Sequence, residues 1–207
     1  MQSMKDILGK MKNPFFLRLM GLTRPFLISG RSFDLTHTEE ALHELINFLK
    51  LKKNKELNHN ILIPAMIFHD CGWSKVPKNI LNLSYGDVKA DNPGKIIHQK
   101  EGALIAKKIL KEINYDSELV DEICYIVSVH DNPSKYKKNP NALIVAETDK
   151  LVRYGDLLFY ELIKKRIQTL EERINFLENG IEKWFSIPEY KAKARSLLEQ
   201  KRSKLKH

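Results

Sequence analysis

Histidine and aspartate residues recur along the middle of this chain in a pattern that suits metal binding. His37 comes first, a consecutive His69-Asp70 pair follows, and Asp149 lies further on in an apolar segment. A charged carboxylate among apolar residues is costly unless it is paired or coordinates a metal. Imidazole and carboxylate together suit Mn, Fe, Co, Ni or Zn, with Mg possible where oxygen ligands dominate. These four residues therefore predict a divalent metal site.

Two further histidines extend the series. His98 opens one predicted helix and His130 ends the next. Each has a structural alternative, since a histidine at a helix start can bond to a carbonyl and one at a helix end is a favourable cation. His130 is followed by Asp131 and an Asn-Pro turn. We interpret Asp131 as the turn residue and leave it out of the predicted site.

The elements that must position these residues are predicted to be helices, because apolar residues recur at spacings of three and four. We expect helices over 38–52, 61–73, about 97–110, 118–130, 142–155 and 159–180, then a basic helix. Polar residues over 79–95 predict a surface loop, and the last apolar stripe should break at Asn179-Gly180. Five successive helical segments thus each offer a candidate ligand.

This order of ligands resembles the HD-domain superfamily of metal-dependent phosphohydrolases, which carry a His, a His-Asp pair and a distant Asp on one helical bundle. The local matches are FHDCGW at 68–73, HQKEGA at 98–103 and ETDKL at 147–151. The resemblance covers roughly residues 30–155 and implies an all-α HD-domain helical bundle. The superfamily acts on many phosphate esters, so the resemblance is unspecific for the substrate.

The resemblance also implies how the ligands divide. In members with two metals, the paired Asp bridges the ions and extra histidines hold the second one. Here Asp70 would bridge, with His98 and His130 at the second ion, and these three would take part in catalysis. A metal-bound hydroxide would attack the phosphorus of a small phosphate ester, for which we expect a nucleotide. A single metal per chain is the alternative.

The sequence departs from the superfamily at the lysine of its common His-Asp-x-Gly-Lys motif. Trp73 stands in that place, where a core or rim aromatic is the simplest interpretation, and Lys75 lies two positions on. Lys75 and Lys150 are candidates for holding substrate phosphate, with charge balance for the carboxylates as the alternative. Arg153 and Tyr154, one turn after the last ligand, could face the same cleft.

A chain of 207 residues is long enough for one main domain with a buried core. We predict an N-terminal arm over 1–29, the HD domain over 30–155, and a C-terminal helical extension over 156–207. We expect the arm to pack on the domain, with a membrane-surface position as the alternative for residues 4–22. The extension is expected to pack on the domain, and a homodimer surface is the alternative.

Composition limits the partners. The net charge of +9 comes from short basic clusters that lack interleaved aromatics, so nucleic acid is an unlikely partner and a small phosphorylated substrate fits better. No apolar run approaches the roughly 18 residues of a membrane span, and the N-terminus lacks a signal peptide's apolar core. The two cysteines show no zinc spacing. We therefore expect a cytoplasmic protein.

Two other functions fit the same residues. Some proteins with this fold hold two irons and cleave carbon bonds with O₂, so a diiron oxygenase is the first alternative. The second is a non-catalytic metal-containing binding module, whose basic C-terminal helices would recruit a partner.

Overall fold

The structure is a computed structural model that describes residues 14–81, 92–165 and 167–204, and these residues contain no strand. The prediction of an all-α protein is therefore confirmed. The α-helices are α2 (Pro14–Ser29), α3 (Asp34–Leu49), α4 (His59–Phe68), α5 (Lys78–Leu81), α6 (Pro93–Glu112), α7 (Ser117–Val129), α8 (Pro133–Tyr136), α9 (Pro140–Leu151), α10 (Asp156–Lys164), α11 (Leu170–Trp184) and α12 (Pro188–Lys204). Three 3₁₀ turns join them: η1 (Lys52–Asn54), η2 (Cys71–Lys75) and η3 (Val152–Tyr154).

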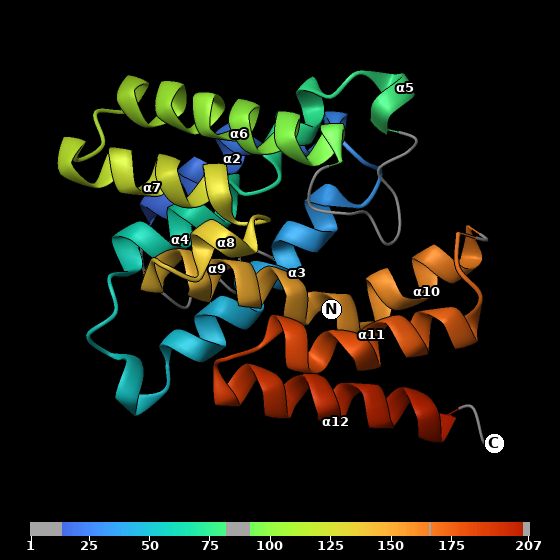
Figure 1. Ribbon diagram of the computed structural model, residues 1–207. Helices are drawn as coiled ribbons and strands as arrows, with labels where there is room; N and C mark the ends of the chain where they lie inside the picture. The colour runs from blue at the N-terminus through green and yellow to red at the C-terminus, as the bar shows by residue number, and fades with distance from the viewer. Residues whose placement is uncertain (1–13, 82–91, 166, 205–207) are drawn as a thin grey trace.

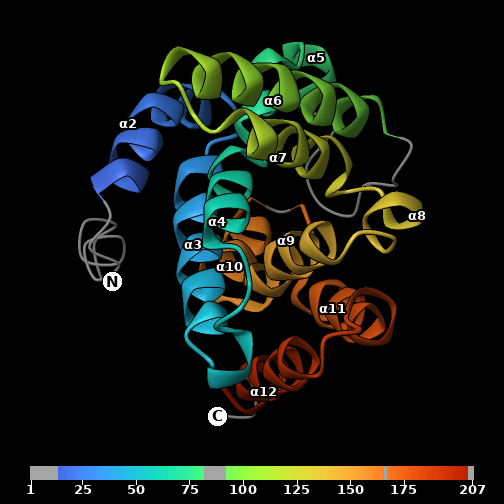
Figure 2. The same cartoon turned by 90° about the vertical axis from the view of Figure 1, so that its left-hand side faces the viewer.

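Helix α4 lies at the centre of the bundle. Its residues from Ile61 to Phe68 are all buried, in agreement with a sequence that is apolar on every face. Helices α2, α3, α6, α7 and α9 all contact it, and Figure 2 shows α3 beside α4 with the α6–α7 hairpin across one end. The helix predicted over 61–73 ends earlier, at Phe68, and η2 follows. The His69-Asp70 pair lies at this junction.

The reason for the early end is the close approach of η2 to α6. A Cβ atom on Gly72 would lie 1.9 Å from the His98 carbonyl oxygen and 2.5 Å from the Gly102 nitrogen. Only a glycine lets the two backbones come this close. This contact brings His98 next to the His69-Asp70 junction.

Helices α3 and α6 begin several residues earlier than predicted. Helix α3 begins at Asp34, whose carboxylate accepts a 2.6 Å hydrogen bond from the Arg31 backbone N–H. Helix α6 begins at Pro93, because Asn92 caps it through the Gly94 N–H and proline suits a first helical position. Of the loop predicted over 79–95, residues 82–91 lie outside the described part of the chain.

The apolar residues over 159–180, for which one helix was predicted, belong to two helices, α10 and α11. Thr169 and Glu172 form a capping box that starts α11 anew, so α10 ends at Lys164. The break predicted at Asn179-Gly180 is wrong, since α11 runs on to Trp184. The Trp184 ring packs over Gly180, where a Cβ would meet it at 2.3 Å.

One apolar core runs across both predicted domain boundaries. It includes Phe16 and Leu19 of α2, Leu62 of α4, and Tyr190 and Leu198 of α12. Figure 1 shows α11 and α12 side by side below the rest of the bundle, so the C-terminal helices lie on the domain in this structure. The division into three parts and the homodimer surface stay predictions. Residues 1–13 of the arm lie outside the described residues.

Candidate metal centre

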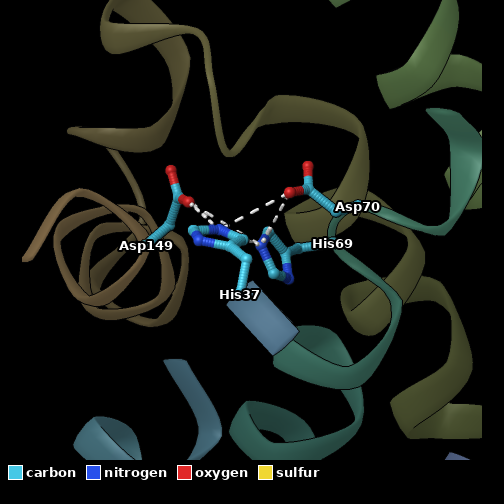
Figure 3. Close-up of side chains that lie close together, drawn as sticks. All are labelled: His37, His69, Asp70 and Asp149. Carbon is cyan, nitrogen blue, oxygen red and sulfur yellow. Dashed lines mark hydrogen bonds and ion pairs between the residues drawn. The ribbon is translucent and has the colours of Figure 1, made fainter. Parts of the chain in front are cut away.

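His37, His69, Asp70 and Asp149 meet in a buried group that we call the first cluster (Figure 3). His37 comes from the first turn of α3, the pair from the α4–η2 junction, and Asp149 from α9. His37 Nε2 lies 2.8 Å from Asp149 Oδ1 and 3.3 Å from His69 Nε2. Asp70 Oδ2 lies 3.5 Å from His37 Nε2 and 3.4 Å from His69 Nε2. Three separate segments of the chain thus bring four candidate ligands together.

Asp70 also belongs to a second cluster, with His98 and His130. Its Oδ1 atom lies 3.7 Å from His98 Nε2 and 3.8 Å from His130 Nε2, and the two imidazole nitrogens are 3.3 Å apart. The two carboxylate oxygens of Asp70 therefore face different clusters. This is the geometry of a bridging ligand.

The tautomers of three histidines fit a cation in these clusters. Nδ1 of His69 lies 2.7 Å from the Met66 carbonyl, and His130 makes the same contact with Val127 at 2.8 Å. Nδ1 of His98 lies 3.2 Å from the carbonyl of the residue one turn before it. Because a carbonyl only accepts, each Nδ1 carries a proton, and each Nε2 presents a lone pair to its cluster when the ring is neutral. The Nε2 atoms of His98 and His130 lie 3.3 Å apart beside the Asp70 carboxylate, an arrangement that suits a shared positive ion.

Burial and neighbouring charges shift the pKa values of these candidate ligands in different directions. Burial raises the pKa of Asp70, but His69 and Arg31 outweigh it and hold that pKa well below its ordinary value. Burial also lowers the pKa of His98 to about 3, with the nearby His130 adding to the effect. Burial lowers the pKa of His69 as well, but Asp70 and Asp149 raise it to about 9. Metal binding at His69 would therefore compete with a proton and release it.

Arg31 and Trp73 orient the carboxylate of Asp70. Arg31 Nη2 donates to Asp70 Oδ2 at 2.8 Å, and Trp73 Nε1 donates to Asp70 Oδ1 at 2.9 Å. Arg31 is itself held by Asp34, through a 2.7 Å hydrogen bond from Nε. Arg31 and Asp34 were not predicted as site residues, because they precede the motif that carries the resemblance and show no spacing of their own.

A cavity opens beside the first cluster and occupies about 560 Å³, its open mouth included. His37, Asp70 and Asp149 of the first cluster are among the residues that line it. The residues that line the rest are four cations, one further carboxylate and three apolar side chains: Arg31, Lys95, Arg153, Arg173, Asp131, Phe33, Leu158 and Leu162. The predicted position of Arg153 at the cleft is thus confirmed.

Asp131 is the site residue that the sequence analysis set aside. It lies in the turn after α7, as expected, yet its buried carboxylate lines the cavity. Lys150, Lys95 and Arg153 surround it at 3.8 to 3.9 Å. Burial raises the pKa of Asp131, but the two lysines hold it below its ordinary value. The sequence carried one indication that Asp131 belongs to the site: it follows His130 directly, as Asp70 follows His69.

Of the two predicted phosphate-binding lysines, Lys150 lies beside the first cluster, with Nζ 4.0 Å from Asp149 Oδ2. Lys75 is exposed at the end of η2. Lys150 is buried, and its Nζ atom contacts Asp131 and the carbonyl oxygens of Ala146 and His130, which fits the alternative of charge balance. The Tyr154 hydroxyl donates to the Leu177 carbonyl at 2.6 Å and so joins η3 to α11. Roles of the two lysines in substrate binding stay predictions.

Histidines and aspartates from successive helices of this bundle converge on one shared carboxylate, an arrangement able to hold divalent metal. The family model for the HD domain matches residues 35–154, which is more than half of the chain. The chain therefore belongs to the HD domain family, and the resemblance is confirmed. No curated protein and no solved structure shows significant similarity to it.

Proposed function

We propose that this protein is a metal-dependent phosphohydrolase that acts on a small phosphate ester. HD domains are generally metal-dependent hydrolases, and this chain has residues able to hold divalent metal. The observation that carries the proposal is the position of Asp70. Its two oxygens face two clusters, and the carboxylate borders a cavity rich in cations.

In this proposal His37, His69, Asp70 and Asp149 hold one ion, and His98 and His130 share Asp70 with a second. Bound divalent ions would activate a water molecule and balance charge on the phosphoryl oxygens. Arg31 and Trp73 hold the plane of Asp70 by their hydrogen bonds to its two oxygens. The backbone carbonyls bonded to Nδ1 keep the imidazole rings turned toward the clusters.

The cations of the cavity would bind the phosphate group. Arginine and lysine recognise phosphate oxygens through charge-assisted hydrogen bonds. Arg153 Nη2 lies 3.6 Å from Asp149 Oδ2, Lys95 Nζ lies 3.9 Å from Asp131 Oδ2, and both residues line the cavity. A nucleotide is the specific substrate we predict, because these cations suit a phosphate and the chain as a whole is basic.

Metal analysis and a grid of metals against phosphate esters test the proposal. Protein loaded with Mn, Co, Ni, Fe, Zn or Mg should release phosphate from at least one ester. Asp70→Ala should lose bound metal at both clusters and fall to background turnover. Asp121→Ala is the matched control, because Asp121 is exposed on α7 and should change neither quantity. Full metal content and turnover in Asp70→Ala would refute the proposal.

A diiron oxygenase is the second candidate, favoured by the single carboxylate that joins two clusters. Iron at two per chain, with oxygen uptake on a polyol or phosphonate and no phosphate release, would identify it. Metal binding without any turnover would favour the non-catalytic module.

None of the described helices combines the length and apolar character needed to cross a membrane. The cytoplasmic location stays a prediction.

A further inference from the structure

Three apolar side chains that are not part of the main core line the cavity. Phe33, Leu158 and Leu162 form a buried cluster of their own, which we call the apolar wall. Leu158 and Leu162 lie one turn apart on α10, beyond the end of the family match at residue 154. The C-terminal extension therefore contributes directly to the cavity beside Asp70.

The apolar wall lies close to the metal-binding residues. Arg31 connects them, since its Nη2 atom lies 2.8 Å from Asp70 Oδ2 and its Cζ atom lies 4.9 Å from the centre of the Phe33 ring. The Arg31 guanidinium thus contacts both the Asp70 carboxylate and the Phe33 ring of the wall. A phosphate held by the cluster would place its organic group against the wall.

Binding sites combine apolar walls with a few convergent polar groups, and the wall selects the apolar part of the ligand. We propose that the apolar wall holds an uncharged planar ring, so that the ligand is a phosphate ester with an aromatic or heteroaromatic ring. Cationic organic groups are disfavoured, because the Arg31 guanidinium lies over the Phe33 face. The reaction rests on the proposed function, whereas ring binding needs only the cavity.

Calorimetric binding of phosphonates to the full-length protein as purified tests ring recognition without turnover. The wild type should bind phenylphosphonate about tenfold more tightly than methylphosphonate, the usual order for one added apolar group. Leu162→Asn should bring this ratio close to one, and Leu162→Met should restore it. Leu157→Asn is the matched control, because Leu157 is half-buried on the same helix and lies outside the cavity lining. Equal binding of both phosphonates by the wild type would overturn the inference.

Turnover measurements separate this inference from the proposed function. Phenyl phosphate should be preferred over glycerol phosphate and phosphoethanolamine, and Leu162→Asn should remove the preference. Comparison of adenosine monophosphate with ribose 5-phosphate shows whether a nucleobase serves as the ring. Phosphonate selectivity without phosphate release from any ester would refute only the proposed function. Phosphate release with the same ester preference in wild type and Leu162→Asn would refute only the ring inference.

Discussion

The indole ring of Trp73 lies parallel to the imidazole of His98, with ring centres 4.1 Å apart and planes at 8°. The same indole donates its N–H to Asp70, and the Arg31 guanidinium lies over it at 4.1 Å. One side chain therefore fixes the plane of a candidate ligand and the carboxylate that faces both clusters. It stands where the common motif of the superfamily has a lysine.

Replacement of this indole should weaken the second cluster selectively. Trp73→Phe keeps an aromatic ring over His98 but removes the hydrogen bond to Asp70 Oδ1. Loss of such a supporting hydrogen bond lowers metal affinity by about 10-fold or more. Metal titration should show a weaker second binding step and an unchanged first one. Trp184→Phe, at the end of α11, is the control, and identical titrations for wild type and Trp73→Phe would contradict this role.

The glycine after the His-Asp pair should not tolerate a side chain. Gly72→Ala would place Cβ 1.9 Å from a backbone oxygen of α6, and the backbones must separate. We expect the free energy of unfolding to fall by about 3 kcal/mol, measured by urea denaturation. Gly21→Ala is the control, because nothing lies within 4 Å of its added Cβ and alanine favours a helix. A Gly72→Ala protein as stable as the wild type would mean that η2 and α6 are less closely packed.

Removal of the charge on Asp131 should destabilise the fold in a way that anions reverse. Asp131→Asn leaves Lys95, Lys150 and Arg153 without their common carboxylate. Loss of one partner from a buried ionic group costs on the order of 3 kcal/mol. Phosphate in the buffer should recover part of the loss in melting temperature, since an anion can replace the carboxylate. The exposed Asp121→Asn serves as control, and a phosphate shift equal to that of the wild type would contradict the prediction.

Glu147 should be required for attachment of the C-terminal helices. It is fully buried on α9, and its carboxylate accepts hydrogen bonds from the backbone N–H groups of Ser186 and Ile187 at 2.8 and 3.0 Å. Glu147→Ala leaves both donors unsatisfied, at about 1 to 3 kcal/mol for each. Protease digestion should then cut between α11 and α12 faster than in the wild type. Glu147→Gln should retain one acceptor and show a smaller effect, and equal digestion of all three proteins would refute the role.

Stability should depend on pH through Glu40. Burial and the neighbouring Glu44 raise the pKa of Glu40 to about 7, against the opposing charge of Lys201, while His43 and Lys193 line the same pocket. The folded chain thus keeps a proton that the unfolded chain has released, so stability falls as pH rises toward 7. Relative to the wild type, Glu40→Gln should melt about 2 °C higher at pH 8 and show little difference at pH 5. A constant difference across this range, or one matched by the exposed Glu56→Gln, would exclude Glu40 as the cause.

The sequence by itself determined the helical class and the order of the ligands. Both are local properties, since the spacing of apolar residues decides which face of a helix is buried and the His-Asp pair is contiguous in the chain. It also indicated that a carboxylate in an apolar helix, Asp149, needs a partner. The boundaries of the helices were predicted less well, because capping side chains decide them. Asn92 and Thr169, for example, set where α6 and α11 begin.

Only the tertiary structure decided which residues surround the ligands. Arg31, Asp131 and Leu162 come from a turn, a second turn and the C-terminal extension, and no spacing in the sequence relates them. In the sequence, only the resemblance implied that Asp70 is shared between two clusters. The positions of its two carboxylate oxygens come from the tertiary structure. These relationships depend on the packing of α3, α6 and α9 around α4 and of α10 against η3, since contacts between distant segments follow from the shapes of many side chains at once.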